Sequence, residues 1–329
     1  MEYRRLGATG LEISRLCLGC GNFGGIGSAP AFFGMGESEA QAFELMDRAW
    51  DAGITFFDTA DAYGGGRSES YIGRWLTSRG SHVRDRLVLT SKVFNPVGPG
   101  PNERGLSRLH IMRQIDASLA RLHTDRLDVY LMHEVDPATP IEETLQAMQD
   151  VRRAGKVLHI GASNIGARQL AQALGASDAR RLARLDCVQN SYSLLDRAVE
   201  RELLPLCADS GVGFMAYSPL AGGWLTGKYR RDAAYPAGSR MTLRPEPYRH
   251  LTTDAIFDGL AALERAARAR DVSPGALALA WVLAQPVVDA AVIGPRRPDH
   301  LEQTLSALEI RLSPAEAGDL AAVFDHAQC

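Results

Sequence analysis

The amino-acid sequence predicts an α/β fold in which eight parallel strands close into a (β/α)8 TIM barrel, with an N-terminal β-hairpin and an extra C-terminal helix. Three observations lead to this fold. Short apolar runs of strand length recur eight times along the 329 residues. Amphipathic segments of helical length lie between them nearly throughout. Eight β/α units in a chain of this size fit one closed barrel.

The first element is expected to be a hairpin that plugs the bottom of the barrel. The first twelve residues hold two short β-like pieces around Thr9-Gly10, a dipeptide suited to a tight turn. The barrel strands follow as short apolar runs, which we assign to Arg15–Leu18, Thr55–Phe57, Leu87–Thr90, Asp128–Met132, Leu158–Ala162, Asp186–Asn190, Gly213–Ala216 and Ala290–Ile293.

Four segments between these strands show the clearest helical periodicity: Glu37–Asp51, Ser107–Leu122, Ile141–Ala154 and Val199–Asp209. Helix start and stop signals accompany them, because Pro140 precedes the third segment and Gly155 and Gly211 follow the third and fourth. The stretch Arg230–Thr253 is rich in Pro, Arg and Tyr and has no period. It is predicted to be a long loop after the seventh barrel strand, and long loops of this kind often act as lids.

Composition and charge exclude several classes of partner. With 46% hydrophobic and 23% charged residues, the chain is typical of a globular protein, and we expect residues 1–329 to form one domain. A net charge of −3 gives no basic excess, so neither nucleic acid nor an anionic membrane is expected. The N-terminus lacks the apolar core of a signal peptide, and the most apolar window, Ala276 to Ile293, is cut by polar residues. We therefore expect a cytoplasmic protein and make no prediction of its oligomeric state.

The five cysteines include a C-x-x-C pair, Cys17 and Cys20. A metal or redox site would need a second pair or a helix start beside it, and neither is present. We expect buried, reduced thiols and no metal site.

The Gly-rich stretch Gly19–Gly24 matches the G-x-G-x-x-G pattern of dinucleotide-binding Rossmann folds. In that fold a helix must begin at the glycines so that its N-terminus faces a pyrophosphate. Here Pro30 follows and no helix is expected before about Glu37, so the Rossmann interpretation is rejected. The glycines, Gly21 among them, are expected to let a first loop fold closely over a ligand.

Polar side chains follow three neighbouring predicted strands at their carboxyl ends, where the functional residues of such barrels collect. Asp58 follows the second strand with Tyr63 on its loop, Lys92 closes the third strand, and His133 closes the fourth. Taken singly, an Asp–Lys pair or a loop tyrosine is often structural. Four complementary groups on adjacent strands favour a catalytic cluster.

Lys92 carries particular weight because the chain has only three lysines against 33 arginines. A lysine kept at a strand end suggests a role that needs a compact ammonium whose pKa responds to burial. Beside Asp58 it is expected to stay charged and to lower the pKa of the Tyr63 phenol, which would make Tyr63 a general acid. His133 is expected to donate a hydrogen bond to a carbonyl oxygen.

The stretches DTADAYGGGRSESYIG, LTSK, the strand ending in His133, and SYSLLDRAVERELLPLCADSGVGFMAYSPLAGGWLTGKY together resemble the aldo-keto reductase superfamily. The resemblance is strongest to its bacterial and potassium-channel-β-related branch and runs from Arg5 to about Ala307. It implies reduction of aldehydes or ketones by a nicotinamide cofactor, with Asp58, Tyr63, Lys92 and His133 as the catalytic tetrad.

A hydride donor is required because none of the four side chains can supply two electrons. Ser163 and Asn164 end the fifth strand and Gln189 lies near the end of the sixth, and the resemblance implies that they bind the nicotinamide amide. Tyr217 would stack on the nicotinamide ring. The resemblance also implies that SPLAGGWLTGK follows the diphosphate through Ser218, Leu220, Gly222 and Lys228.

The segment Ile293 to Thr304 resembles the family's adenosine 2′-phosphate region with departures. Pro295 has no N–H to give a phosphate, whereas Arg296 and Arg297 could compensate for it. We therefore expect NADPH, with NADH possible, and the implied contacts on this side are Gly294, Arg296, His300 and Gln303.

The substrate is expected to be a small carbonyl compound, or an alcohol or sugar in the reverse direction. Its pocket could be lined by Phe32, Phe33, Phe94, Tyr192 and Trp224. Two other functions stay open, namely an NADPH-binding regulatory subunit with little turnover, and a Schiff-base aldolase with Lys92 as nucleophile.

Overall fold

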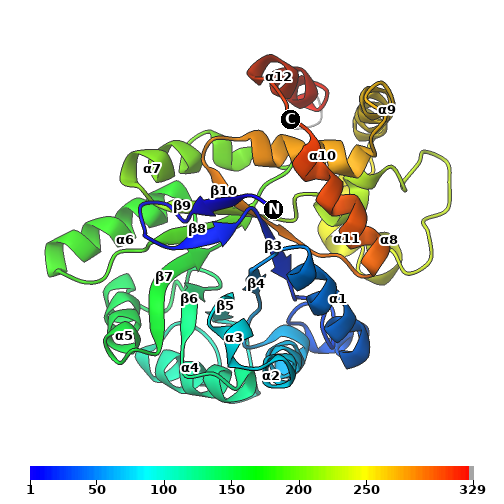
Figure 1. The fold of residues 1–329 in the computed structure, drawn as a ribbon. Coiled ribbons are helices and arrows are strands. Elements are labelled where there is room, and N and C mark those ends of the chain that lie inside the picture. Colours follow the sequence, from blue (N-terminus) through cyan, green and yellow to red (C-terminus); the bar gives the residue numbers. More distant parts are fainter. Residues whose placement is uncertain (326–329) are drawn as a thin grey trace.

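A computed structural model describes residues 1–325 and confirms the (β/α)8 barrel (Figure 1). Eight parallel strands close in the order β10-β3-β4-β5-β6-β7-β8-β9. Their bounds are β3 Leu16–Gly19, β4 Phe56–Asp58, β5 Val88–Val93, β6 Leu127–Met132, β7 Val157–Ser163, β8 Cys187–Ser191, β9 Gly213–Tyr217 and β10 Val288–Ile293. All eight predicted strands are present, and the main difference is that β5 extends to Val93 and so includes Lys92.

Helices surround the barrel: α1 Glu39–Asp51, α2 Arg67–Arg79, α3 Ser81–Arg84, α4 Arg108–Leu122, α5 Ile141–Arg153, α6 Ala167–Arg180, α7 Leu203–Ser210, α9 Asp254–Arg268, α10 Pro274–Ala284, α11 Pro298–Leu305 and the expected extra C-terminal helix α12 Pro314–Ala322. Ser38 and Ser107 cap α1 and α4 by accepting hydrogen bonds from backbone N–H groups of the first turn. The prediction of a helix from Val199 was wrong at its start. The chain makes a 3-10 turn at Ala198–Glu200, and α7 begins at Leu203 with Pro205 in its first turn, where a missing N–H costs little.

The N-terminal hairpin is confirmed as strands β1 Tyr3–Arg5 and β2 Glu12–Ser14. It crosses the amino end of the barrel (Figure 1), where Gly7 N–H donates to Asp289 Oδ2 at 2.8 Å and Ala8 N–H donates to the Gly211 carbonyl at 2.9 Å. The Arg4 guanidinium also donates to the Val288 carbonyl, at 3.0 Å. These contacts close the end of the barrel opposite the predicted site.

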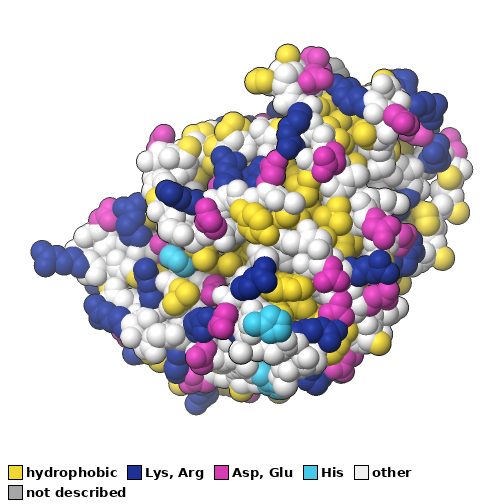
Figure 2. Space-filling model, in the orientation of Figure 1, with side chains coloured by type: hydrophobic (Ala, Val, Ile, Leu, Met, Phe, Trp, Pro, Cys, Tyr) yellow, Lys and Arg dark blue, Asp and Glu magenta, His cyan; other side chains and the backbone are white. Residues whose placement is uncertain are grey.

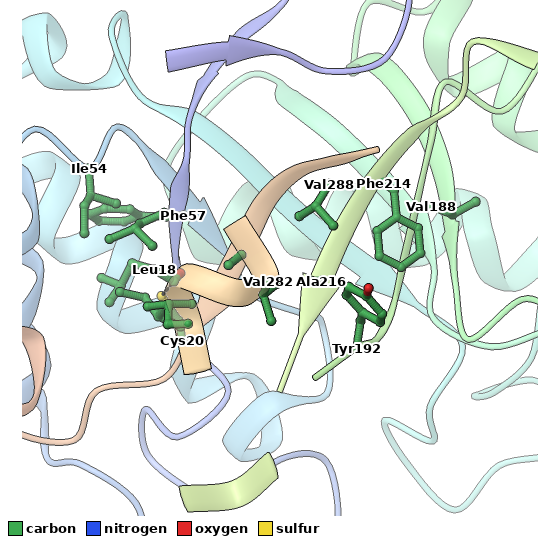
Figure 3. Close-up of a cluster of buried hydrophobic side chains, with 14 of the residues drawn as sticks. Leu18, Cys20, Ile54, Phe57, Val188, Tyr192, Phe214, Ala216, Val282 and Val288 are labelled. Carbon is green, nitrogen blue, oxygen red and sulfur yellow. Dashed lines mark hydrogen bonds between the residues drawn. The ribbon is translucent and has the colours of Figure 1, made fainter. Parts of the chain in front are cut away.

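Buried side chains form two layers. The barrel interior holds one small cluster: Leu6, Ile13, Cys17, Phe56, Val88, Val129, Leu131, Cys187, Met215, Ala290 and Val292. The larger cluster lies between the outer faces of the strands and the helices. Figure 3 shows part of it, with Leu18 and Phe57 on the left and Val188 and Phe214 on the right. This alternation of side chains follows the two-residue period of a strand. The cysteines at positions 17, 20, 187 and 207 are buried and free, while Cys329 lies outside the described residues.

The segment predicted as a long loop is irregular for most of its length but contains two short helical pieces, α8 Arg240–Leu243 and a 3-10 helix at Glu246–Leu251. It contacts the loop after β3 and the segment after β9. Arg240 donates to the Asn22 side chain at 2.6 Å, and a Cβ on Gly222 would meet the Tyr248 ring at 2.4 Å. The segment therefore covers the loops that follow the first and seventh barrel strands.

On the face shown in Figure 2, basic and acidic side chains are interspersed, without a large area of one sign. Among residues 1–325, no helix has the length and apolar character needed to span a bilayer.

Candidate functional site

The four predicted catalytic residues lie together at the carboxyl end of the barrel. Asp58 ends β4 two residues after the interior Phe56, and His133 follows β6 two residues after the interior Leu131. Lys92 lies four residues after the interior Val88 on β5. Because alternate residues of a strand face the same side, all three side chains enter the barrel as one layer above its apolar filling.

Lys92 is the centre of this layer and is completely buried. Its ammonium donates to Asp58 Oδ2 at 2.5 Å, to the Thr59 carbonyl at 3.0 Å and to the Tyr63 phenol oxygen at 3.3 Å. Each of its three N–H donors thus has an acceptor, which a planar guanidinium could not reproduce in the same space. Burial lowers the pKa of Lys92, but the charges of Asp58 and Tyr63 and their hydrogen bonds raise it above its ordinary value. Lys92 therefore stays charged, as the sequence predicted.

Three glycines hold Tyr63 in place at the start of a 3-10 turn, Tyr63–Gly66. All three have positive φ, with Gly64 at 58°, Gly65 at 68° and Gly66 at 86°. A Cβ on Gly64 would come within 2.6 Å of the Phe23 carbonyl oxygen of the first loop. The glycines after Tyr63 therefore allow both the left-handed turn and the close contact with that loop.

The predicted lowering of the Tyr63 pKa is wrong for this structure. Burial raises the pKa above its ordinary value of 10, and the Lys92 ammonium lowers it by less. Sequence reasoning identified the opposing charge but could not give the depth at which the phenol is buried. At neutral pH the phenol keeps its proton, as a general acid requires.

His133 is neutral, because burial and then the Lys92 charge lower its pKa well below the ordinary 6.5. Its Nε2 lies 3.3 Å from the Tyr63 phenol oxygen, and the Asn95 amide nitrogen lies 3.0 Å from its Nδ1. An amide that donates to Nδ1 leaves the single ring proton on Nε2, which faces Tyr63. Asn95, on the loop after β5, was missed by sequence analysis because nothing in the sequence shows that this loop folds back onto the strand after it.

The four residues assigned to the nicotinamide amide and ring also meet at this rim. Gln189 donates through its amide nitrogen to Asp58 Oδ1 at 2.9 Å, so its amide oxygen remains to accept a hydrogen bond. The Ser163 hydroxyl donates to the Gln189 carbonyl at 2.8 Å. Asn164 donates to the His133 carbonyl at 2.9 Å and accepts from the Tyr217 hydroxyl at 2.6 Å. The amide-bearing residues are thus connected directly to the tetrad.

The segment assigned to the diphosphate folds as a tight loop after β9. Ser218 has a φ of 52° and Gly222 a φ of 63°, and the backbone from Ala221 to Thr226 is a 3-10 helix with a kink at its glycines. A Cβ on Gly223 would meet Lys228 Nζ at 2.3 Å, so the glycine admits this cation against the backbone. Leu220 is half-buried at the start of the loop. A Cβ on Gly21 of the first loop would lie 3.5 Å from the Tyr63 ring.

The residues assigned to the adenosine end lie beside Lys228. Burial lowers the pKa of Lys228, and the charges of Arg240, Arg296 and Arg297 lower it further, which shows that four cations gather here. Arg297 is exposed and its guanidinium is paired with Asp299 at 2.9 Å. His300 is half-buried, and burial and the charges of Arg297, Lys228 and Arg296 lower its pKa. Gly294 and Gln303, which are close to it in the sequence, are exposed. Arg240 was missed because its segment has no pattern that sequence reasoning can use.

Two of the five aromatic residues assigned to the substrate pocket lie elsewhere. Tyr192 is buried in the outer layer beside Phe214 (Figure 3), and its hydroxyl donates to Glu200 at 2.7 Å. Trp224 is buried among other aromatic rings, with the Tyr229 ring 4.9 Å away. The prediction failed because the direction of a strand does not determine on which side a residue of the following loop packs. That side depends on tertiary contacts.

Phe32 and Phe33 remain near the site, on the first loop. A Cβ on Gly65 would contact the Phe33 ring at 2.9 Å, and the Arg244 guanidinium lies 5.3 Å from the centre of the Phe32 ring. Phe94 is half-buried and packs against the outer core.

Comparisons with known proteins point to one family. The model of the Aldo/keto reductase family matches residues 15–325. The uncharacterized oxidoreductase YrpG of Bacillus subtilis is 42% identical over 95% of this chain and 92% of its own length. A protein of Arabidopsis thaliana named "Probable voltage-gated potassium channel subunit beta" is 36% identical over 94% and 92%. The L-glyceraldehyde 3-phosphate reductase of Escherichia coli is 34% identical over 94% and 88%.

Proposed function

Because the chain belongs to the aldo/keto reductase family, we propose that it is an NAD(P)H-dependent oxidoreductase that reduces aldehydes or ketones to alcohols, or catalyses the reverse oxidation. Tyr63 is the general acid for reduction and the general base for oxidation. The observation that carries this proposal is the buried Lys92 ammonium, bonded at once to Asp58, Thr59 and the Tyr63 phenol at the barrel mouth.

The arrangement of donors around Tyr63 explains how its proton would be delivered. Lys92 Nζ and His133 Nε2 each lie 3.3 Å from the phenol oxygen, and both present N–H donors to it. The phenol proton must therefore point to a third partner, which is the carbonyl oxygen of a substrate. When the proton leaves, the phenolate keeps two donors, one of them charged, so the developing charge is stabilised without reorganisation. Asp58 holds the ammonium in place and does not itself reach the phenol.

The bound reduced nicotinamide would supply the hydride to the carbonyl carbon. The chain's own residues fit such a group. Gln189 has one amide end fixed by Asp58 and the other left to accept from a carboxamide N–H. Ser163 and Asn164 stand beside it at the end of β7, and Tyr217 provides a half-buried ring at the end of β9.

NADPH is the favoured donor in this proposal. Lys228, Arg240 and Arg296 gather at the far end of the site, where the Glu37 carboxylate pairs with Arg296 but leaves a net positive charge that favours a further anion. A ribose 2′-phosphate would supply that anion, and guanidinium groups suit its geometry. Lys228 would meet the diphosphate through its position against Gly223.

The substrate class is a small carbonyl compound. The name of the Escherichia coli relative makes a small aldose a sensible member of any substrate panel. The Schiff-base aldolase alternative is disfavoured, because Lys92 has its pKa raised and all three N–H donors engaged, whereas a nucleophilic amine must be neutral.

A second candidate function is an NADPH-binding regulatory subunit, which the similarity to the Arabidopsis protein favours. The two functions differ in turnover. A regulatory subunit would bind NADPH tightly and show negligible oxidation of it with every carbonyl compound in the panel.

The proposal is tested by Tyr63→Phe. We expect at least about a hundredfold loss of kcat in the reduction of 4-nitrobenzaldehyde, because the phenyl ring has no proton to give. The Kd of NADPH, measured by fluorescence titration, should stay nearly unchanged. Tyr71→Phe is a matched control, since Tyr71 lies on α2 with its ring stacked under Arg74 and away from the tetrad. Full activity in Tyr63→Phe would show that Tyr63 is not the general acid.

A further inference from the structure

A buried carboxylate, Glu37, lies among the cations at the end of the site assigned to the adenosine. Glu37 is 3% exposed and lies at the end of the first loop, immediately before the N-cap of α1. Its backbone is held by the same loop, because its N–H donates to the Asn22 carbonyl at 2.9 Å and its carbonyl accepts from Gly24 N–H at 2.9 Å. These bonds hold the backbone of Glu37 in place, and the N-cap of α1 is the neighbouring Ser38.

The Glu37 carboxylate is bonded to Arg296, the guanidinium that would recognise a 2′-phosphate. Its Oε1 accepts a hydrogen bond from Arg296 Nε at 2.6 Å, while Arg296 Nη1 donates to the Gly238 carbonyl at 3.0 Å. The other oxygen, Oε2, is buried and accepts no hydrogen bond from any residue of the described chain. A buried carboxylate with one unused oxygen is unusual, since such groups are normally satisfied. The contact between Glu37 and Arg296 was not expected from the sequence, because it joins residues 259 positions apart.

The charge of Glu37 acts on the two dinucleotides differently. A phosphate dianion at Arg296 would share this guanidinium with a carboxylate already bonded to it, and burial leaves little water or salt to screen the repulsion. A ribose with a free 2′-hydroxyl carries no such charge and does not meet this penalty. The acid therefore weakens NADPH selectively, although the neighbouring Lys228 and Arg240 still attract it.

We propose that Glu37 is a specificity-determining residue that lowers the preference for NADPH over NADH, so that the protein accepts both. This inference rests on the proposed function, because it assumes that a nicotinamide dinucleotide binds with its adenosine end at Arg296. It does not depend on turnover or on the identity of the carbonyl substrate.

Glu37→Gln separates the charge of Glu37 from its contact with Arg296. Glutamine keeps an oxygen that can accept from Arg296 Nε, so the guanidinium stays oriented, but the negative charge is removed. We expect the Kd of NADPH to fall by about tenfold, with the Kd of NADH nearly unchanged. Both constants are measured on the cofactor-free protein by fluorescence titration, and no substrate is needed.

Two further variants make the result interpretable. Glu39→Gln removes the nearest other acid in the sequence, which is half-exposed and paired with Arg74 at 2.5 Å, and should leave both Kd values unchanged. Arg296→Ala should weaken NADPH more than NADH. If Glu37→Gln fails to fold, as circular dichroism would show, Glu37→Met is of similar length, also uncharged, and should shift the ratio of the two Kd values in the same direction.

The outcomes are distinct. Weaker NADPH binding in Glu37→Gln, or an unchanged ratio of the two Kd values, would show that the negative charge of Glu37 does not disfavour the 2′-phosphate, and the inference would be wrong. Failure of the unmodified protein to bind either dinucleotide would instead overturn the proposed function. A ratio that shifts equally in Glu39→Gln would trace the effect to overall charge and contradict a specific role for Glu37.

Discussion

Asn95 is the residue through which the loop after β5 reaches the tetrad. Its amide nitrogen lies 3.0 Å from His133 Nδ1, and the opposite ring nitrogen faces the Tyr63 phenol. This contact fixes which nitrogen carries the proton, and it disfavours the doubly protonated ring because Nδ1 is already accepting. Asn95 is thus a positioning residue that acts through His133.

We predict that Asn95→Leu lowers kcat for a model aldehyde by about tenfold, the effect of one lost hydrogen bond. The acid limb of the pH profile of kcat should also move to higher pH, because an unoccupied Nδ1 makes the ring easier to protonate. The Kd of NADPH should not change. Asn102→Leu, in the same loop but exposed, is the control. An unchanged pH profile, or an equal loss in both variants, would argue against the positioning role.

Residue-level prediction from the sequence succeeded where a strand determines direction and failed where burial or loop packing does. The position of Asp58, Lys92 and His133 at the barrel mouth could be predicted, because a strand end places a side chain there whatever surrounds it. The pKa of Tyr63 could not, because it depends on how deeply the ring is buried. Arg240 and Glu37 were missed because their proposed roles depend on contacts between loops that are far apart in the sequence.

At the scale of elements, a polar cluster joins α2 and α4 to the outer face of the barrel. Glu69 on α2 accepts from Ser91 at 2.6 Å and from Arg121 on α4 at 2.7 Å. Asp61, on the loop after β4, is 2% exposed, and neither of its carboxyl oxygens receives a hydrogen bond from the described residues. Burial, and then the Glu69 charge, raise the pKa of Asp61 well above its ordinary 3.8. The sequence marks helices and strands well, but it does not reveal a buried carboxyl group of this kind.

We predict that Asp61→Asn stabilises the protein at pH 8 by about 1 to 2 kcal/mol. The folded state holds the Asp61 proton more tightly than the unfolded state, so this group makes stability fall as pH rises above about 4. The advantage of the asparagine variant should therefore be small near pH 4 to 5 and grow towards pH 8. Urea unfolding at several pH values measures it, with the exposed Asp51→Asn as control. The same advantage at every pH would contradict this account of Asp61.

At the scale of the whole molecule, we predict different roles for the two ends of the barrel. The tetrad and the cation cluster lie where β4, β5, β6 and β9 end, whereas the hairpin closes the end where β9 and β10 begin. The alternation of strands and helices made this division predictable from sequence, because function collects at the carboxyl ends of barrel strands. The contacts that fix the hairpin could not be predicted, since they join residues nearly three hundred positions apart, as between Gly7 and Asp289.

A substitution at Asp289 can test whether the hairpin end of the barrel affects the site at the other end. Asp289 is 7% exposed, and its Oδ2 accepts from Gly7 N–H at 2.8 Å and from Phe214 N–H at 3.2 Å, which connects the hairpin to β9 and β10. Asp289→Ala leaves both N–H groups without this acceptor, and we expect a loss of about 2 to 4 kcal/mol in the free energy of unfolding. Because the site lies at the other end of a rigid barrel, kcat at 25 °C and the Kd of NADPH should match those of the unmodified protein. Glu12→Ala, on the exposed side of the hairpin, should alter neither property. If Asp289→Ala lost NADPH affinity while keeping its stability, the hairpin would be coupled to the site through the strands, and the division of tasks between the two ends would be wrong.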